Sequence, residues 1–110
     1  MGGIGTPVHE VDEETLDALL WALSDHRRRK LLRTLRRQPE REWPLDDVIA
    51  SLAEPAGTES RQQLHVLLRH VHLPKLDEHG LVDYDAGRGV VVYRSHDVAE
   101  ALLEHLAAYE

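Results

Sequence analysis

The sequence predicts one mainly α-helical domain with a small β-hairpin near its C-terminal end. Apolar residues recur at the spacing of helices through most of the chain, change to the alternating spacing of strands after Gly80, and return to helical spacing after Arg94. A chain of 110 residues is the size of one domain with one hydrophobic core. The first eleven residues carry three glycines and a proline without periodicity. We therefore expect a flexible arm over residues 1–11 and a single domain over residues 12–110.

Two helices are predicted at the start of the domain. Asp12 or Thr15 is placed to cap the first helix, and Ser24 is placed to cap a second helix over residues 25–37. An aspartate in the first turn of this second helix and arginines in its last turn suit the helix dipole. The apolar stripes are Leu16, Leu19, Leu20 and Leu23 in the first helix, and Leu31, Leu32 and Leu35 in the second.

A short third helix is predicted over residues 46–53, with Asp46 or Asp47 placed to cap it. A proline and a glycine follow it and end the helical pattern. Trp43 lies in the connector before this helix, and we expect it to fill the gap between helices. The apolar stripe of the third helix is Leu45, Val48, Ile49 and Leu52.

The fourth predicted helix begins at Thr58 or Ser60 and is longer and more polar than the third. Pro74 has no amide hydrogen and crowds the carbonyl group of His70, so the helix should kink or restart there. It should end at Gly80, which is suited to the left-handed position after a helix. The buried side is predicted to consist of Leu64, Leu67, Leu68 and Val71, continued by Leu73 and Leu76.

A β-hairpin is predicted over residues 81–94, because two β-rich runs flank a glycine-containing turn at residues 86–89. Ser95 is placed to cap a last helix over residues 96–109. The apolar stripe of this helix is Ala99, Leu102, Leu103 and Leu106.

This order of elements is typical of a winged helix-turn-helix domain, in which the hairpin is the wing. Residues 24–35, SDHRRRKLLRTL, and residues 72–85, HLPKLDEHGLVDYD, resemble the arsenical-repressor-like transcriptional regulators, and the resemblance covers residues 16–94. The link at residues 54–59 is longer than the usual tight turn, and Pro74 interrupts a helix that is continuous in that family. The metal-binding cysteines of the family are missing, so its sensing chemistry does not carry over.

The composition is acidic and poor in lysine, with 20 Asp and Glu residues against 13 Lys and Arg, only two of which are lysine. Together with the absence of phenylalanine, this composition resembles that of short winged-helix proteins from haloarchaea. In molar salt the Debye length is about 3 Å, so the acidic net charge repels DNA only at short range. The lack of cysteine excludes disulfides and thiolate sites, and the sequence has no apolar run long enough to span a membrane. We expect a cytoplasmic protein.

The polar side of the fourth helix is the predicted recognition surface for DNA. Arginine and glutamine donate and accept hydrogen bonds at base edges in the major groove. The recognition helix is expected over residues 58–72, and Arg88, between two glycines at the tip of the wing, is expected at the DNA backbone or minor groove. The candidate contacts on the helix are Arg61, Gln62, His65, Arg69 and His72. The alternative is that these residues form an ordinary solvated face.

Eight of the thirteen basic residues lie within residues 27–41. This basic region could contact phosphates beside the recognition helix, through Arg27, Arg28 and Lys30. Alternatively, it could form ion pairs with the acidic runs at residues 10–14 and 97–104, in the same chain or in a partner.

The first and last helices are predicted to form a dimer interface, because their apolar stripes are broader than one small core requires. The residues assigned to this interface are Leu16, Leu19, Leu20, Leu102, Leu103 and Leu106. A two-fold dimer would place two recognition helices about 34–36 Å apart on a near-palindromic site. The alternative is that the two helices pack on each other within a monomer.

These observations favour a sequence-specific, double-stranded DNA-binding transcriptional regulator that acts as a homodimer. The alternative is a winged-helix module for protein interaction or dimerisation, which docks to a transcription-machinery or signalling partner without binding DNA. No glycine loop, nucleophile motif or paired-carboxylate constellation suggests an enzyme, and we expect no cofactor. The eight histidines include no close pair of the HExxH type, so no metal site is expected.

Overall fold

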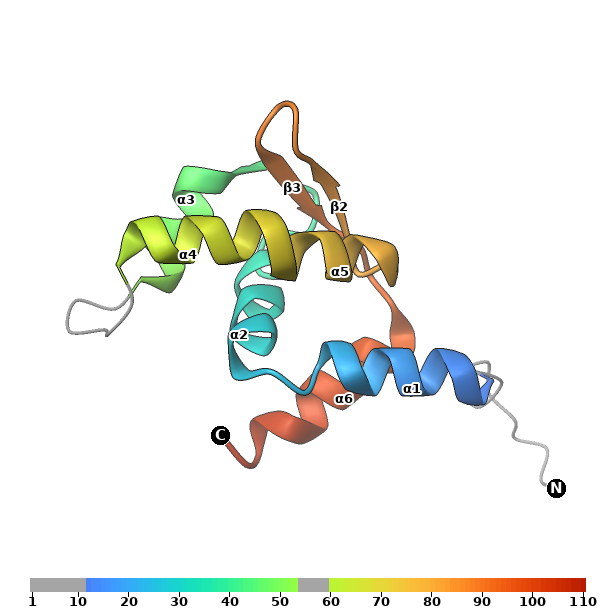
Figure 1. The fold of residues 1–110 in the computed structure, drawn as a ribbon. Helices are drawn as coiled ribbons and strands as arrows, with labels where there is room; N and C mark the ends of the chain where they lie inside the picture. Colours follow the sequence, from blue (N-terminus) through green and yellow to red (C-terminus); the bar gives the residue numbers. More distant parts are fainter. Residues whose placement is uncertain (1–11, 54–59) are drawn as a thin grey trace, which may run out of the picture.

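The computed structural model describes residues 12–53 and 60–110 (Figure 1). Its elements are α1 (Glu13–Ala22), α2 (His26–Leu35), β1 (Trp43–Pro44), α3 (Leu45–Leu52), α4 (Arg61–Leu67), the π-helical turn η3 (Leu68–His72), α5 (Leu73–Glu78), β2 (Val82–Asp85), β3 (Val90–Tyr93) and α6 (Asp97–Ala107). The chain is therefore mainly helical with a small antiparallel sheet, as predicted, and this arrangement is compatible with a winged-helix-like fold. The arm expected over residues 1–11 and the link at residues 54–59 lie outside the described residues.

The first two helices begin at aspartates. The Asp12 carboxylate accepts a hydrogen bond of 2.7 Å from the backbone N–H of Thr15, which confirms one of the predicted caps. Hydrogen bonds from the side chain and the backbone of Thr15 lower the pKa of Asp12. The predicted Ser24 cap is wrong by one residue. Asp25 caps α2 by accepting from the N–H of Arg27, whereas the Ser24 hydroxyl donates to the carbonyl oxygen of Trp21 in the last turn of α1.

Two further caps also differ from the prediction. Helix α3 begins directly after Pro44, so Asp46 and Asp47 lie inside its first turn and not at its cap. Helix α6 is capped by His96, because the Ser95 hydroxyl is engaged with the carboxylate of Glu100. The predicted apolar stripe of α3 is confirmed, and all four of its residues are buried.

The fourth and fifth helices form one continuous helical rod that contains the π turn (Figure 1). Within the turn, the N–H of Leu73 donates to the carbonyl oxygen of Leu68, five residues earlier. Pro74 follows in the first turn of α5, as expected for a residue without an amide hydrogen. The π turn has more residues per turn than an α-helix and rotates the side chains that follow Leu68. Val71, predicted to be buried, is therefore exposed, whereas His72 faces the core.

The hairpin is confirmed, with β2 and β3 antiparallel and Asp85 opposite Val90 across the four-residue turn 86–89. Gly80 and Gly89 have φ of 74° and 67°, a backbone conformation that favours glycine. A third strand was not predicted: β1 pairs with β3, giving the order β1-β3-β2. Two residues are too few to produce an alternating pattern in the sequence.

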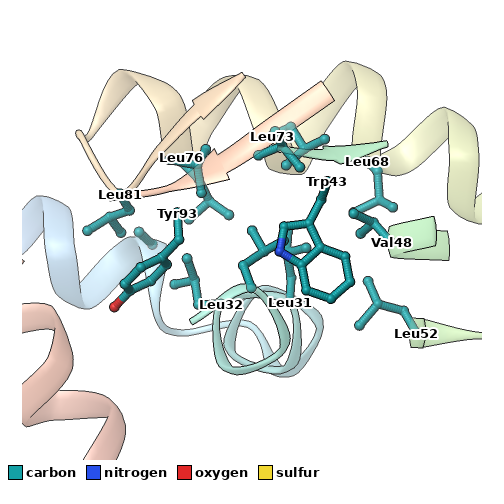
Figure 2. Packing of buried hydrophobic residues seen from close by; sticks show 14 of the residues in the cluster. Leu31, Leu32, Trp43, Val48, Leu52, Leu68, Leu73, Leu76, Leu81 and Tyr93 are labelled. Atoms are coloured by element: carbon teal, nitrogen blue, oxygen red, sulfur yellow. The ribbon is translucent and has the colours of Figure 1, made fainter. Parts of the chain in front are cut away.

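The core lies between α2, the rod and the sheet (Figure 2). Leu31, Leu32 and Leu35 of α2 are fully buried, as predicted, and Trp43 packs against this helix from the neighbouring strand. Burying a leucine side chain contributes roughly 2 kcal/mol to stability. The rod is held on the core through Leu64, Leu68, Leu73 and Leu76, so its opposite side is left facing outward.

Candidate nucleic-acid interface

The outward side of α4 and the π turn carries most of the recognition-helix residues that were predicted to contact DNA. A capping box fixes the start of α4, in which the Ser60 hydroxyl accepts from the N–H of Gln63 and the Gln63 side chain accepts from the N–H of Ser60. Burial of Leu64 and Leu68 then sets the rotation of the helix about its axis. The side chains left exposed on the other side are Arg61, Gln62, Val66, Arg69 and His70.

Three of the five predicted helix candidates, Arg61, Gln62 and Arg69, are exposed, and His65 is half-buried. His72 is not on this surface. Only 4% of its surface is exposed, because the π turn rotates it toward the core. There its Nδ1 lies 3.5 Å from Nη1 of Arg28. The prediction that His72 belongs to the outer polar face is therefore wrong.

The outer surface also contains two residues that the sequence reasoning did not assign to it, Val66 and His70. Val66 is two positions from both Leu64 and Leu68, and this spacing by itself places it on the opposite side of a helix. The position of His70 depends on the π turn, which leaves no periodic signal in the sequence.

Arg88 lies exposed at the tip of the β2–β3 hairpin, as predicted, but it already has a partner. Its Nη2 and Nη1 lie 3.1 and 3.3 Å from the two carboxylate oxygens of Glu42, just before β1. This hydrogen bond and the charge of Glu42 raise the pKa of Arg88. The Asp85 carboxylate also accepts from the Arg88 backbone N–H, which holds the turn. A ligand phosphate at this site would have to displace the Glu42 carboxylate.

Arg28 in α2 is a structural residue and not the phosphate contact predicted from the sequence. Only 6% of its surface is exposed. Its Nε donates to the carbonyl oxygen of Ala22 at 2.6 Å, and its Nη2 donates to that of Trp21 at 3.1 Å. Its guanidinium group also lies over the Trp21 ring, 4.4 Å from the centroid. Arg28 thus joins the C-terminal end of α1 to α2 and reaches His72 in the rod.

Other arginines of α2 hold the C-terminal helix. Arg29 and Arg33 contact the carboxylate of Glu110 at 2.8 and 2.5 Å and lower its pKa to about 2. Arg36, just after α2, lies 3.7 Å from Glu104. Of the two roles predicted for the basic region, ion pairing within the chain is therefore observed. Glu104 belongs to the acidic run predicted as the partner, whereas Glu110 lies beyond it.

The two remaining phosphate candidates differ in exposure. Arg27 is exposed in the first turn of α2. Lys30 is half-buried, and its ammonium group donates to the carbonyl oxygen of Leu52 at 3.3 Å. Both residues belong to α2, and neither is part of α4 or the π turn.

The residues predicted for dimerisation divide into two groups. Leu19 and Leu103 are buried within the chain, so their assignment to an intermolecular surface is wrong. Leu102 and Leu106 of α6 are half-buried. Leu16 and Leu20 are 37% and 45% exposed and lie one turn apart on α1, followed directly by the 45% exposed Trp21.

The described residues form neither a cluster suited to a metal ion nor a membrane-spanning helix. Over residues 12–53 and 60–110, no group of three or more histidine, aspartate or glutamate side chains is arranged to hold a metal ion. In the same ranges, no helix has the length and apolar character needed to cross a membrane.

Comparison with known proteins identifies a family. No curated protein and no solved structure matches the chain. One family model, described as "Domain of unknown function (DUF7344)", matches residues 20–92, which is more than half of the 110 residues and extends from the end of α1 to β3. The chain therefore belongs to the DUF7344 family.

Proposed function

We propose that this protein is a sequence-specific transcriptional regulator that binds double-stranded DNA as a homodimer, with α4 and the π turn in the major groove. The observation that carries the proposal is the contrast between two groups of arginine side chains, those without an ion pair and those paired within the chain. Among the described residues, Arg61 and Arg69 make no ion pair and are exposed on the outer side of α4 and the π turn. Arg29, Arg33 and Arg36, in contrast, are engaged with carboxylates of the chain itself.

The side chains on the outer side of α4 have the chemistry that base recognition requires. An arginine can donate two hydrogen bonds to the O6 and N7 atoms of guanine, and a glutamine can pair with the N6 and N7 atoms of adenine. Arg61, Gln62 and Arg69 present these groups from a helix whose inner side is fixed by buried leucines. A rigid support is what precise positioning at base edges needs.

The wing supplies a second contact in this proposal. Arg88 is held at the tip of the hairpin and already binds a pair of anionic oxygens, those of Glu42. A DNA phosphate presents the same charge and a similar arrangement of oxygen atoms. On binding, the phosphate would replace the Glu42 carboxylate.

The resemblance to arsenical-repressor-like regulators supports the same function. The resemblance to haloarchaeal proteins suggests that the protein works at a high salt concentration. The net charge is −7, which opposes DNA binding in dilute buffer. In molar potassium chloride this repulsion is screened within about 3 Å. Few phosphate contacts also mean a shallow salt dependence, because the loss of affinity scales with the number of phosphates neutralised. We propose that the protein acts in such a cytoplasm.

The exposed residues of α1 suggest the dimer contact. Leu16 and Leu20 are exposed one turn apart and form an apolar strip on α1, whose N-terminal end extends away from the rest of the domain (Figure 1). Trp21 lies on another side of this helix, against Arg28 and Lys75. In a two-fold dimer the same strip from both chains would meet, which would cover it and set the separation of the two recognition helices. The half-buried Leu102 and Leu106 of α6 are the proposed flank of this contact.

The test is selection of bound fragments from the host genome by the full chain at high potassium chloride, with the mass of the free protein measured in the same buffer. Enrichment of a near-palindromic motif by a species of about 25 kDa, twice the 12.5 kDa of one chain, is the expected result. Failure to enrich any sequence across a salt series would overturn the DNA-binding proposal.

The second candidate function is a protein-interaction module without DNA binding. The exposed apolar strip of Leu16 and Leu20 on α1 is the observation that favours it. It predicts that substitutions on α1, and not on α4, abolish the activity of the protein in its host. A dimer that binds no DNA sequence would support this alternative.

A further inference from the structure

We propose that Val66 contacts the 5-methyl group of a thymine and so makes the recognition helix specific for a T·A pair at one position of each half-site. This inference rests on the proposed DNA-binding function. It assigns a base preference to a residue that contributes neither charge nor hydrogen bonds.

Val66 lies on the part of α4 that is farthest from the core. It is 50% exposed, while Leu64 and Leu68, two positions before and after it, are buried. Two residues turn an α-helix by more than half a revolution, so Val66 faces directly away from both leucines. A β-branched side chain in a helix is held almost entirely in one rotamer. Its methyl groups are therefore presented outward in a fixed position.

The neighbours of Val66 are polar and exposed. Gln62 lies one turn before it and His70 one turn after it on the same side of the rod, and Arg69 lies three positions after it. A protein-docking surface needs a contiguous apolar patch of several residues. A single methyl-bearing side chain between hydrogen-bonding residues instead matches the edge of a base pair, where the thymine methyl lies beside polar atoms of the bases.

The expected effect is small and specific. Burying one methyl-sized group is worth about a fourfold change in affinity. Uracil pairs as thymine does and lacks only the methyl group, so replacing thymine with uracil removes this contact and leaves the hydrogen bonds of the base pair in place. The loss should occur at one thymine of each half-site and not be spread over all of them.

The experiment uses the full chain and the DNA sequence that it selects. Each thymine of the selected duplex is replaced in turn by uracil, and the affinity is measured by competition for wild-type protein, Val66→Ala and Val71→Ala. Val71 is 41% exposed on the next turn and does not follow the line from Gln62 through Val66 to His70, so Val71→Ala is the matched control. Circular dichroism melting checks that both variants are folded.

We expect the wild-type protein and Val71→Ala to lose about fourfold in affinity at one thymine of each half-site. Val66→Ala should be insensitive there, and should bind the unmodified site about sixteenfold more weakly, which is about fourfold for each of the two half-sites. If uracil has no effect at any position, or the same effect on Val66→Ala as on the wild type, the assignment of Val66 is overturned although the DNA-binding function stands. If the wild-type chain selects no sequence, the proposed function fails and this inference fails with it.

Discussion

Helices α2 and α4 both carry arginines, but they use them in opposite ways. Helix α2 is the more basic of the two, and three of its arginines bind groups of the chain itself. Arg28 binds backbone carbonyl groups at the end of α1, and Arg29 and Arg33 bind Glu110. Helix α4 and the π turn that continues it have fewer charges, and Arg61 and Arg69 point outward. The density of charge along a sequence therefore does not locate a ligand surface. The burial and partners of each charged group do.

The largest effect is expected from Arg28→Ala, which tests whether α2 is structural. The substitution removes two donors from carbonyl groups at the end of α1 and the contact with Trp21, so the free energy of unfolding should fall by about 3 kcal/mol. Chemical denaturation measures this change in the free energy of unfolding. Arg37→Ala, an exposed site just after the same helix, is the control and should change stability by less than about 0.5 kcal/mol. Equal losses would contradict the structural role of Arg28.

The next largest effect is expected on DNA binding and tests the role of α4. Arg69→Ala should weaken binding to the selected sequence by about ten- to a hundredfold for each half-site, the range expected for loss of one arginine–base contact. Arg36→Ala, which removes only a surface ion pair with Glu104, should change affinity far less. Both are measured by titration at the same salt concentration. Equal losses would mean that the recognition helix has been assigned to the wrong element.

A smaller effect is expected from Glu110→Gln and tests whether the α2 arginines hold α6. Arg29 and Arg33 lower the pKa of Glu110 from 4.5 to about 2, so its stabilising contribution is complete above pH 4.5 and is lost as the pH falls toward 2. The wild-type protein should melt at a higher temperature than Glu110→Gln near neutral pH, and the two melting temperatures should converge over that window. Added salt should also reduce the difference. A difference that is independent of pH would contradict the ion-pair explanation.

The smallest effect is expected at the wing. Glu42→Gln removes the anionic partner of Arg88, so the arginine no longer has to leave a carboxylate in order to bind a phosphate. Affinity for DNA should rise by about two- to threefold, as expected for an exposed ion pair. In a protein that already carries Arg88→Ala, Glu42→Gln should not change the affinity for DNA. A double-mutant cycle measures this difference between the two backgrounds. An unchanged or lower affinity of Glu42→Gln alone would remove Arg88 from the interface.

Much of the fold could be predicted because burial of apolar residues repeats with the period of each element. The stripe of Leu45, Val48, Ile49 and Leu52 and the hairpin around residues 86–89 are examples. Cap positions were less predictable. Ser24 and Asp25 are both good caps, and which one is used depends on where the Ser24 hydroxyl finds another acceptor.

The candidate site could be predicted only in part. Arg61, Gln62 and Arg69 were placed correctly on the outer side: Arg61 and Gln62 precede the π turn, and Arg69 is its second residue, where the added rotation is still small. His72 was not, because the π turn shifts every side chain after Leu68 relative to the predicted helical face. The outward position of Val66 was available from its spacing to Leu64 and Leu68.

The sequence by itself determined the order of the helices and the hairpin, the leucines of the core and the polar character of one side of α4, because each follows from residues within a few positions of one another. Only the tertiary structure decided which partner each charged side chain contacts. Arg88 meets Glu42 across 46 positions, Arg29 meets Glu110 across 81, and Arg28 approaches His72 across 44. Contacts between residues so far apart depend on how the elements pack, and no local period in the sequence records them.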